Sequence, residues 1–408
     1  MNLLSVDTIG QAREKILAHV KKIPLKNETV SLDEGLGRIL ALDIFAEEDI
    51  PAFDRATVDG YAVQSADTAG AGEAIPVFLK CVGGVSMGDS ARFSIRSGGC
   101  AYVPTGGMLP AGADAVAMVE YCENVGGSIA VYEAAPSGAG VALAGEDAKK
   151  GALLLRRGTL IRPQEAGVLS AAGITGFPVF VPLRLSIIST GDELVSPEEI
   201  PASGKIRDIN SNALKALSQR RGYDVVSCEI VRDDAALLKT AIGKAIAISD
   251  VVVISGGSSK GDKDSTASAI NLAAKPGVFC HGLALKPGKP TILGWDEESQ
   301  TLLAGLPGHP VAAMVVFELL LGWLHDRLFD RLPPFAVPAR VSCNVPGSPG
   351  RTVCQPVILH LEGDSYLAEP VFGKSGMITT LTRADGYVMI DLNKEGLKKG
   401  EGVMVQLF

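Results

Sequence analysis

The stretch VVVISGGSSKGDKD, residues 251–264, places an apolar run directly before a glycine-rich polar loop. An unbroken run of this kind, bounded by glycines, is typical of a strand that is buried on both faces. Gly256 and Gly257 let the backbone turn and come close to a ligand, and the N–H groups that follow can point at phosphate oxygens. For a lone glycine pair, an ordinary strand-to-helix turn is the simpler alternative. The rest of the chain must decide between the two interpretations.

The segments around this loop predict the fold. From about residue 183 the chain alternates strand, glycine loop and helix, ending in a long apolar helix at 311–329, and this rhythm is typical of a doubly wound α/β sheet. Residues 27–180 hold short alternating runs between glycine turns, with a helix at 162–174, and predict mostly β structure. Residues 335–408 have the strand spacing of a small barrel. The N-terminus predicts an amphipathic helix capped by Ser5 or Asp7.

Four domains follow from this reading. We expect an α/β domain built from 1–26 and 181–330, a small helical linker domain from 27–45 and 147–180, a β-rich domain from 46–146, and a C-terminal β-barrel domain from 331–408. A chain of 408 residues, 47% hydrophobic and 21% charged, is too long for one core and agrees with several domains.

Charge and cysteine usage narrow the function classes. A net charge of −8 provides no overall field for nucleic acid or an anionic membrane. The seven cysteines are odd in number and never spaced as CxxC, which argues against a disulfide framework or structural zinc and favours a cytoplasmic location. We find neither a secretory leader nor about 18 uninterrupted apolar residues, so neither nucleic acid nor a membrane is an expected partner.

Polar clusters follow the apolar strands of the α/β region. They are Asp192 with Glu193, Asp233 with Asp234, Asp262 with Asp264, and Lys286 with Lys289. In a parallel sheet these strand ends meet at one edge, where ligands bind. Carboxylates repel a phosphate unless a divalent cation lies between them, and Mg²⁺ is commonly held by one or two carboxylates plus phosphate oxygens. Any single carboxylate here is more simply a helix cap; the set predicts a phosphate ligand with Mg²⁺.

A second polar group lies in the β-rich region. PAFDRATVDGYA (51–62) brings Asp59 into a short polar loop, and YVPTGGMLP (102–110) places Thr105 before two glycines. Together they predict a binding edge of unspecified ligand, although turn chemistry explains each alone. The five histidines show no metal-ligand spacing, and we leave all five out of catalysis, so we expect neither a histidine metal site nor an acyl-enzyme.

The motifs taken together resemble those of the molybdopterin molybdenumtransferase (MoeA) family, which includes the gephyrin E-domain. The matching stretches, in chain order, are PAFDRATVDGYA, PTGGMLP, GED (145–147), STGDEL, IRDINSNAL (206–214), GGSSKGDKD, LALKPGKP, GLPGHP and SGMITTLTRADG (375–386). The resemblance implies a MogA-like central domain. It also implies insertion of molybdenum from molybdate, as substrate, into adenylylated molybdopterin, with Mg²⁺-dependent release of AMP.

The resemblance also implies roles for individual residues. The implied catalytic residues are Asp59, Thr105, Glu193, Asp233 and Asp264, and the last three are the implied metal ligands. The implied substrate-binding residues are Ser255, Gly256, Gly257, Ser258, Lys260, Gly261, Lys286, Lys289, Pro307 and Pro310. The family further implies a homodimer whose β-rich domain faces the partner's α/β domain. Its implied protein partners are a MogA-like adenylyltransferase and molybdoenzyme chaperones.

Two other functions stay open. One is a MogA-like molybdopterin adenylyltransferase, and the other is a gephyrin-like scaffold, which the carboxylate set of Asp59, Glu193, Asp233 and Asp264 disfavours. The loop reads GGSSKGDKD where the family more often has GGVSVGxxD, and His309 stands where Asn is usual. These departures leave the preference for molybdate or tungstate undecided.

Overall fold

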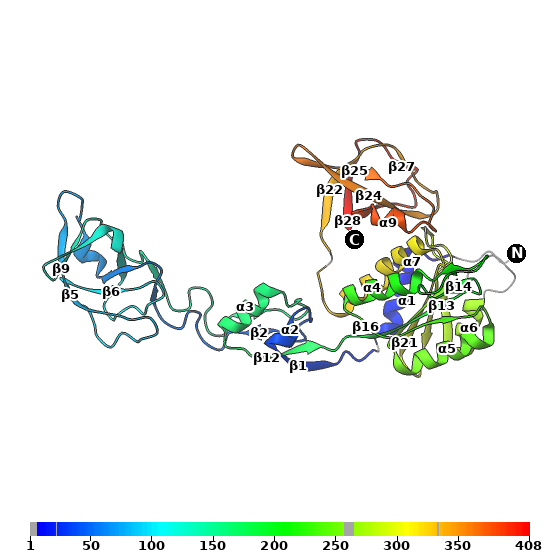
Figure 1. The fold of residues 1–408 in the computed structure, drawn as a ribbon, viewed down its shortest axis with the longest axis horizontal. Coiled ribbons are helices and arrows are strands. Elements are labelled where there is room, and N and C mark those ends of the chain that lie inside the picture. Colours follow the sequence, from blue (N-terminus) through cyan, green and yellow to red (C-terminus); the bar gives the residue numbers. More distant parts are fainter. Residues whose placement is uncertain (1–5, 22, 257–264, 333) are drawn as a thin grey trace. The chain divides into compact units, whose positions relative to one another are not determined.

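A computed structural model describes residues 6–21, 23–256, 265–332 and 334–408 (Figure 1). The chain forms two compact units. The first comprises Met1–Glu28, Gly37–Ile39 and Val179–Phe408, and the second comprises Thr29–Leu36 and Leu40–Pro178. The predicted α/β, β-rich and barrel parts are all present, while the finer division into four domains stays a prediction.

The first unit contains the predicted α/β sheet. Its six strands lie in the order β16-β13-β17-β21-β20-β18. Their bounds are β13 Arg184–Thr190, β16 Asp224–Val231, β17 Val251–Gly256, β18 Pro276–His281, β20 Ile292–Asp296 and β21 Thr301–Leu306. The first four strands in this order are parallel, as predicted, whereas β20 runs antiparallel to both of its neighbours. The connection between β20 and β21, residues 297–300, is too short for a parallel crossover, so these two strands form a hairpin.

Helices cover the sheet in two groups (Figure 1). Their bounds are α1 Ile9–Val20, α4 Asn210–Arg221, α5 Ala235–Ile248, α6 Ser265–Ala273 and α7 Pro310–Phe317. Helices α5 and α6 contact each other and the sheet, while α4 contacts α7, β13 and β16. Residues 251–255 of β17 are buried, and Val252 and Ile254 pack with Leu238 and Ile242 of α5 and Ile270 of α6. Burial of each such side chain contributes about 1.5–3 kcal/mol, which explains why the unbroken apolar run predicted this strand.

The N-terminal helix α1 has a different cap from the one expected. Thr8 is the N-cap: its hydroxyl accepts from the Gln11 N–H at 3.2 Å, and the Gln11 side chain accepts from the Thr8 N–H at 2.9 Å. Asp7 instead pairs with Lys15 at 2.7 Å, and Ser5 lies outside the described residues. The prediction failed because it overlooked the Thr-x-x-Gln pattern, which satisfies two backbone donors reciprocally.

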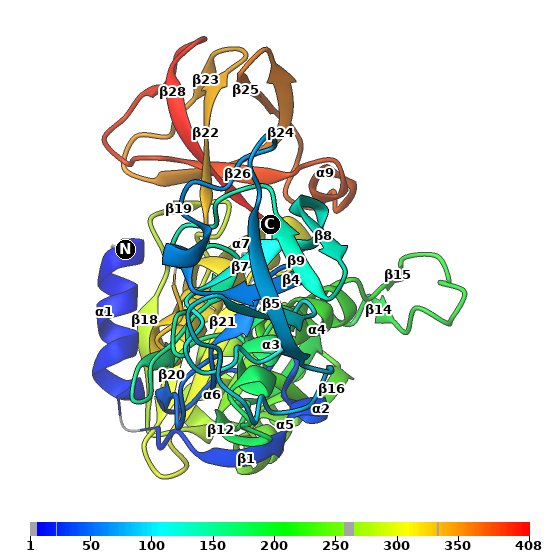
Figure 2. The ribbon, with the colours of Figure 1, turned by 90° about the vertical axis from the view of Figure 1, so that its left-hand side faces the viewer.

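The end of the chain forms a closed barrel, as predicted (Figure 2). Its strands are β22 Ala336–Val341, β24 Thr352–Glu362, β25 Ser365–Pro370, β26 Gly386–Ile390 and β28 Gly402–Leu407. The ring closes because β24 pairs with both β25 and β26. Strand β19, Leu285–Lys286, pairs in parallel with β24. The KPGKP stretch therefore begins on the barrel sheet and not on the α/β sheet, where the sequence had placed it.

The second unit is built on a six-stranded sheet in the order β7-β4-β6-β5-β9-β8. Its strands are β4 Gly60–Val63, β5 Val77–Gly84, β6 Gly99–Val103, β7 Ala115–Met118, β8 Cys122–Val125 and β9 Ser128–Val131. The same unit holds the short pairs β2 Ile44–Phe45 with β11 Leu153–Leu155 and β3 Arg55–Ala56 with β10 Val141–Ala142, and the helices α2 Leu32–Gly35 and α3 Pro163–Ala171. Helix α3 confirms the helix predicted at 162–174.

The long apolar helix predicted at 311–329 is continuous but changes its winding. Helix α7 passes into a π-helical turn, Glu318–Gly322, and then into α8, Trp323–Leu328. Arg13 donates to the Leu319 carbonyl at 2.8 and 3.1 Å, and the Tyr223 hydroxyl donates to the Leu321 carbonyl at 2.8 Å. Side chains thus satisfy carbonyl groups of the π turn. In the described ranges, no helix is both long and apolar enough to cross a bilayer.

His325, on α8, is buried between aromatic rings. Its ring centroid lies 4.9 Å from that of Tyr223 and 4.5 Å from that of Phe329. Burial, and then the positive charges of Arg331 and Arg221, lower the pKa of His325 to about 3. The unfolded chain, with an ordinary histidine pKa of 6.5, therefore binds this proton before the folded protein does.

We expect the free energy of unfolding to decrease as the pH falls below about 6.5, because the proton favours the unfolded chain. One such group gives a slope of at most about 1.4 kcal/mol per pH unit. His325→Leu should make the slope between about pH 6.5 and about pH 4 shallower by up to that amount, as measured by urea unfolding. His360→Leu, which removes an exposed histidine of the barrel, is the matched control. An unchanged slope in His325→Leu would contradict the assignment.

Candidate active site

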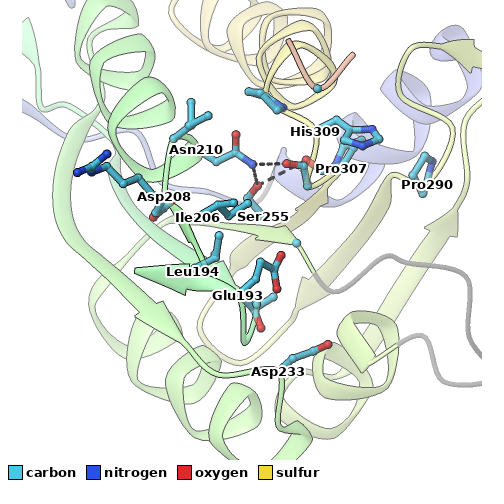
Figure 3. A pocket seen from close by; sticks show the side chains of 18 residues that line it. Glu193, Leu194, Ile206, Asp208, Asn210, Asp233, Ser255, Pro290, Pro307 and His309 are labelled. Atoms are coloured by element: carbon cyan, nitrogen blue, oxygen red, sulfur yellow. Dashed lines mark hydrogen bonds between the residues drawn. The ribbon is translucent and has the colours of Figure 1, made fainter. Parts of the chain in front are cut away.

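The carboxyl ends of the four parallel strands line one pocket of about 510 Å³. Glu193 follows β13, Asp233 follows β16, Ser255 and Gly256 end β17, and the segment 307–310 follows β21. The remaining wall comes mainly from residues 206–210, which lead into α4. Figure 3 shows these side chains around the strand ends. The fold thus brings together residues that are more than 100 positions apart in the sequence.

A hydrogen-bond network fixes the upper wall of the pocket (Figure 3). The Asn210 amide nitrogen donates to the Ser255 hydroxyl and to the Gly308 carbonyl, both at 2.7 Å. These bonds tie α4, β17 and the loop after β21 to one another. Gly256 has φ +116°, and a Cβ there would lie 2.0 Å from the Thr190 carbonyl oxygen. Glycine is therefore required at this position, where the backbone of β17 lies against that of β13.

Two carboxylates of the pocket could hold a divalent cation. Asp233 Oδ1 accepts from the Ser265 hydroxyl at 3.2 Å, and the Asp233 N–H donates to Asp192 Oδ1 at 3.3 Å. Within the described ranges, no group of three or more His, Cys, Asp or Glu is placed to hold a metal ion. Glu193 and Asp233 both line the pocket, and Mg²⁺ commonly takes only one or two carboxylates and completes its shell with phosphate oxygens and water.

A second pocket, of about 720 Å³, lies between the α/β sheet and the barrel strands of the same unit. Its charged lining residues are all cationic: Lys286, Lys289, Arg351 and Lys374. No aspartate or glutamate is among the described residues that line it. We call it the cationic pocket, and the first the carboxylate pocket. The arrangement favours binding of a small anion, because four positive charges converge without an internal counter-charge.

The two pockets share part of their wall. Pro290, Pro307 and His309 line both. The His309 Nδ1 atom lies 3.0 Å from the Ser375 hydroxyl, and the Val311 N–H donates to the Ser375 carbonyl at 3.1 Å. These contacts fasten the start of α7 to the barrel. A ligand in one pocket would therefore lie next to a ligand in the other.

The second unit carries a separate polar pair. Asp59 Oδ1 accepts from the Thr105 backbone N–H at 2.6 Å and from its hydroxyl at 2.9 Å. The backbone bond, and then the hydroxyl bond, lower the pKa of Asp59, so its carboxylate form is favoured. Asp59 precedes β4, whose first residue, Gly60, would place a Cβ 2.1 Å from the Ala117 carbonyl oxygen. The close packing of β4 on β7 therefore sets the position of the Asp59 turn.

Comparison with known proteins identifies the family to which the chain belongs. Family models match along most of its length: "MoeA N-terminal region (domain I and II)" at residues 8–173, "probable molybdopterin binding domain" at 186–326, and "MoeA C-terminal region (domain IV)" at 338–408. A putative molybdopterin biosynthesis protein of Methanocaldococcus jannaschii is 35% identical over 393 residues, which is 94% of this chain and 92% of that protein. The chain belongs to the MoeA family.

Two further matches support the assignment to this family. The molybdopterin molybdenumtransferase of Bacillus subtilis is 30% identical and covers 94% of this chain and 90% of its own length. The crystal structure of a molybdopterin biosynthesis MoeA protein from Pyrococcus horikoshii has a TM-score of 0.82 and 40% identity, with 99% of each chain covered. These matches confirm the family resemblance and the multidomain fold class that the sequence motifs predicted.

The residues that the MoeA resemblance implied fall in four places. Six of them, Glu193, Asp233, Ser255, Gly256, Pro307 and Pro310, line the carboxylate pocket. Lys286 and Lys289 line the cationic pocket. Asp59 and Thr105 are bonded to each other in the second unit. Gly257, Ser258, Lys260, Gly261 and Asp264 lie outside the described residues. Their assigned roles stay predictions.

The sequence reading missed several lining residues of the pockets. Arg351 and Lys374 lie on the barrel and carry no motif of their own. Asp208 and Asn210 lie within IRDINSNAL, which contributed to the resemblance but was assigned no role. Asp234, which the sequence grouped with the site carboxylates, caps α5 by accepting from the Ala236 and Leu237 N–H groups at 2.9 Å. Asp234 is therefore a helix cap, which was the simpler of the two roles that the sequence allowed for each carboxylate.

Thr105→Val should raise the pKa of Asp59, because the variant loses the hydroxyl donor and keeps the backbone N–H. The rise should be partial, since the backbone bond is the larger cause of the depression. Carbon-detected NMR titration of the Asp59 carboxyl measures it directly. Asp67, which accepts from the Gly98 N–H and the Ser97 hydroxyl at 2.7 Å each, serves as the internal control. A pKa of Asp59 that does not move would show that the hydroxyl has no part in the shift.

Proposed function

We propose that this chain inserts molybdenum from molybdate into adenylylated molybdopterin, with Mg²⁺-assisted release of AMP. The observation that carries the proposal is the adjacency of two pockets of opposite charge, which share Pro290, Pro307 and His309. Membership of the MoeA family supports it, as does the name molybdopterin molybdenumtransferase of its relatives in Bacillus subtilis and Haemophilus influenzae.

In this proposal the cationic pocket takes the oxyanion. Molybdate is a small tetrahedral dianion, and Lys286, Lys289, Arg351 and Lys374 offer several N–H donors to its oxygens. Glu193 and Asp233 would repel the same anion, so charge alone keeps it on the barrel side of the shared wall. The proposed arrangement holds the two substrates in adjacent pockets, which replaces a random encounter by a defined one.

The carboxylate pocket would take the nucleotide-linked substrate. Glu193 and Asp233, joined by Asp264 as the resemblance implies, would hold Mg²⁺ against the phosphates. A bound Mg²⁺ neutralises phosphate charge during displacement of AMP. The Asn210 bonds to Ser255 and Gly308 hold the surrounding backbone in place, so the chain's own part is to position the substrate with little rearrangement.

The proposal includes a homodimer. As the resemblance implies, Asp59 and Thr105 of one subunit would face the carboxylate pocket of the other subunit. The low pKa of Asp59 supports a carboxylate that stays charged at neutral pH. Substrate delivery by a MogA-like adenylyltransferase, transfer of product to molybdoenzyme chaperones and a cytoplasmic location stay predictions.

The main test is AMP release from adenylylated molybdopterin with Mg²⁺, with and without molybdate. We expect release that requires molybdate. Lys289→Met should raise the molybdate concentration for half-maximal release at least about tenfold, since a hydrogen bond to a charged group contributes about 1.5–3 kcal/mol. Lys399→Met, on the barrel outside both pockets, should behave as wild type. Tight substrate binding without AMP release would favour the scaffold function, and ATP-dependent formation of the adenylate would favour the adenylyltransferase.

Asp59→Asn and Asp264→Asn should each slow AMP release while leaving thermal unfolding unchanged, because each removes one charge and little volume. Asp67→Asn is the control for the first, since Asp67 makes the same kind of turn contacts on the same unit. The measurement pairs initial rates with a thermal melt of the same sample. Parallel loss of stability and rate in Asp59→Asn would overturn its catalytic role.

A further inference from the structure

Two cysteines of the second unit lie directly opposite each other on neighbouring strands. Cys81 of β5 and Cys100 of β6 are partners in the parallel ladder, and both are free thiols. Neighbouring strands lie about 4.8 Å apart, and a disulfide requires Cα atoms about 4.4–6.8 Å apart. The backbone therefore already holds the two residues at a separation that a disulfide can bridge.

Both side chains lie on the same face of the sheet. Cys100 is part of a cluster of buried apolar side chains that also contains Leu79, and Cys81 packs against that cluster. The Cys100 thiol reaches across to β5, where it donates to the Leu79 carbonyl at 4.0 Å and is hydrogen-bonded to the Cys81 thiol. The Cys81 thiol donates to the Gly83 carbonyl at 3.4 Å. Because thiols form only weak hydrogen bonds, these contacts do not prevent the two sulfur atoms from reacting with each other.

The two thiols differ in their access to solvent. Cys100 is fully buried, whereas Cys81 is half-buried. Burial is the largest cause that raises the pKa of Cys100 to about 12, so this residue stays a neutral thiol. Reactivity of a cysteine follows its thiolate fraction and its exposure. A small oxidant in solution would therefore react with Cys81 first, and Cys100 lies where it can react with the oxidised Cys81.

A metal site is the alternative use of clustered thiols. Cys122 of β8 packs against the same cluster, and its own thiol donates to the Ala117 carbonyl at 3.9 Å. Among the residues that the structure describes, however, no group of three or more His, Cys, Asp or Glu is placed to hold a metal ion. The direct ladder pairing of Cys81 with Cys100 instead favours chemistry between two sulfur atoms.

We propose that Cys81 and Cys100 are a thiol-oxidation site, which a peroxide converts into a reversible disulfide between β5 and β6. The Cys81 sulfur takes one oxygen from the peroxide as the O–O bond breaks, which gives a sulfenic acid and, from hydrogen peroxide, one water. The Cys100 sulfur then forms the S–S bond, the S–O bond breaks, and the oxygen leaves with the Cys100 proton as a second water. The two thiols lose two electrons, and the peroxide gains them. A thiol reductant such as glutathione reverses the change.

The site lies beside a functional turn but does not depend on the proposed function. Strand β6 ends at Val103, and the chain then reaches Thr105, which holds Asp59. A bond at Cys100 would fasten β6 to β5 next to that turn, and it would restrict the unfolded chain between the two cysteines. Neither molybdate nor a nucleotide takes part, so failure of the proposed reaction would leave this site standing, and the reverse is also true.

The first experiment maps the bond in the wild-type protein. The folded full-length chain is treated with hydrogen peroxide, its remaining thiols are alkylated during denaturation, and it is digested without reduction for mass spectrometry. We expect a peptide pair joined through Cys81 and Cys100, which disappears after treatment with reduced glutathione. A Cys81 that stays open to alkylation, or that is joined to Cys122 instead, would overturn the proposal. Conversion of Cys81 to a sulfinic acid without the cross-link would also overturn it.

The second experiment tests the role of each thiol. Cys100→Ala should lose the cross-link and leave Cys81 as a sulfenic acid, which dimedone traps, because the sulfur that resolves it is gone. Cys81→Ser, at the more exposed position, should also lose the cross-link and should leave Cys100 reduced. Cys122→Ala is the matched control, since Cys122 is half-buried against the same cluster, and it should form the cross-link as wild type does. Loss of the cross-link in Cys122→Ala, or oxidation of Cys100 in Cys81→Ser, would contradict the assigned roles.

Discussion

The site depends on one geometric constraint, which is that parallel strands end at the same edge of a sheet. β16, β13, β17 and β21 are parallel and adjacent, so the segments after them converge although they are far apart in the sequence. Buried apolar strands hold this edge rigid, and the Asn210 bonds to Ser255 and Gly308 connect its parts. The carboxylates and the glycine turn at Gly256 both occupy positions that this edge supplies.

The barrel supplies positive charge to the cationic pocket beside the carboxylate-lined edge of the α/β sheet. An edge rich in carboxylates cannot bind an oxyanion by itself, and the cationic pocket arises only where Arg351 and Lys374 of the barrel meet Lys286 and Lys289. Strand β19 pairs with β24, and Ser375 is bonded to the start of α7, so the two parts share hydrogen bonds as well as a wall. In the proposed function, this separation of charge lets two substrates lie side by side in different pockets.

The sequence predicted features that depend on local pattern. The apolar run VVVI, the strand-end carboxylates and the barrel spacing each have a periodicity or a motif, and their elements are present. Prediction from the sequence failed where a contact joins segments that are far apart in the chain. Lys286 was placed with the α/β edge because nothing local shows that β19 pairs with a strand some 65 residues later, and Arg351 and Lys374 have no motif. The pairing of Cys81 with Cys100 is also invisible in sequence, since it is defined by the register of β5 with β6.

The central claim is that the oxyanion and the nucleotide-linked substrate occupy different, adjacent pockets. Anomalous diffraction from crystals grown with molybdate tests it most directly, because molybdenum can be located by its own scattering. The account predicts a molybdenum peak among Lys286, Lys289, Arg351 and Lys374, on the barrel side of His309. A peak beside Glu193 and Asp233, or no peak in the cationic pocket at saturating molybdate, would contradict it.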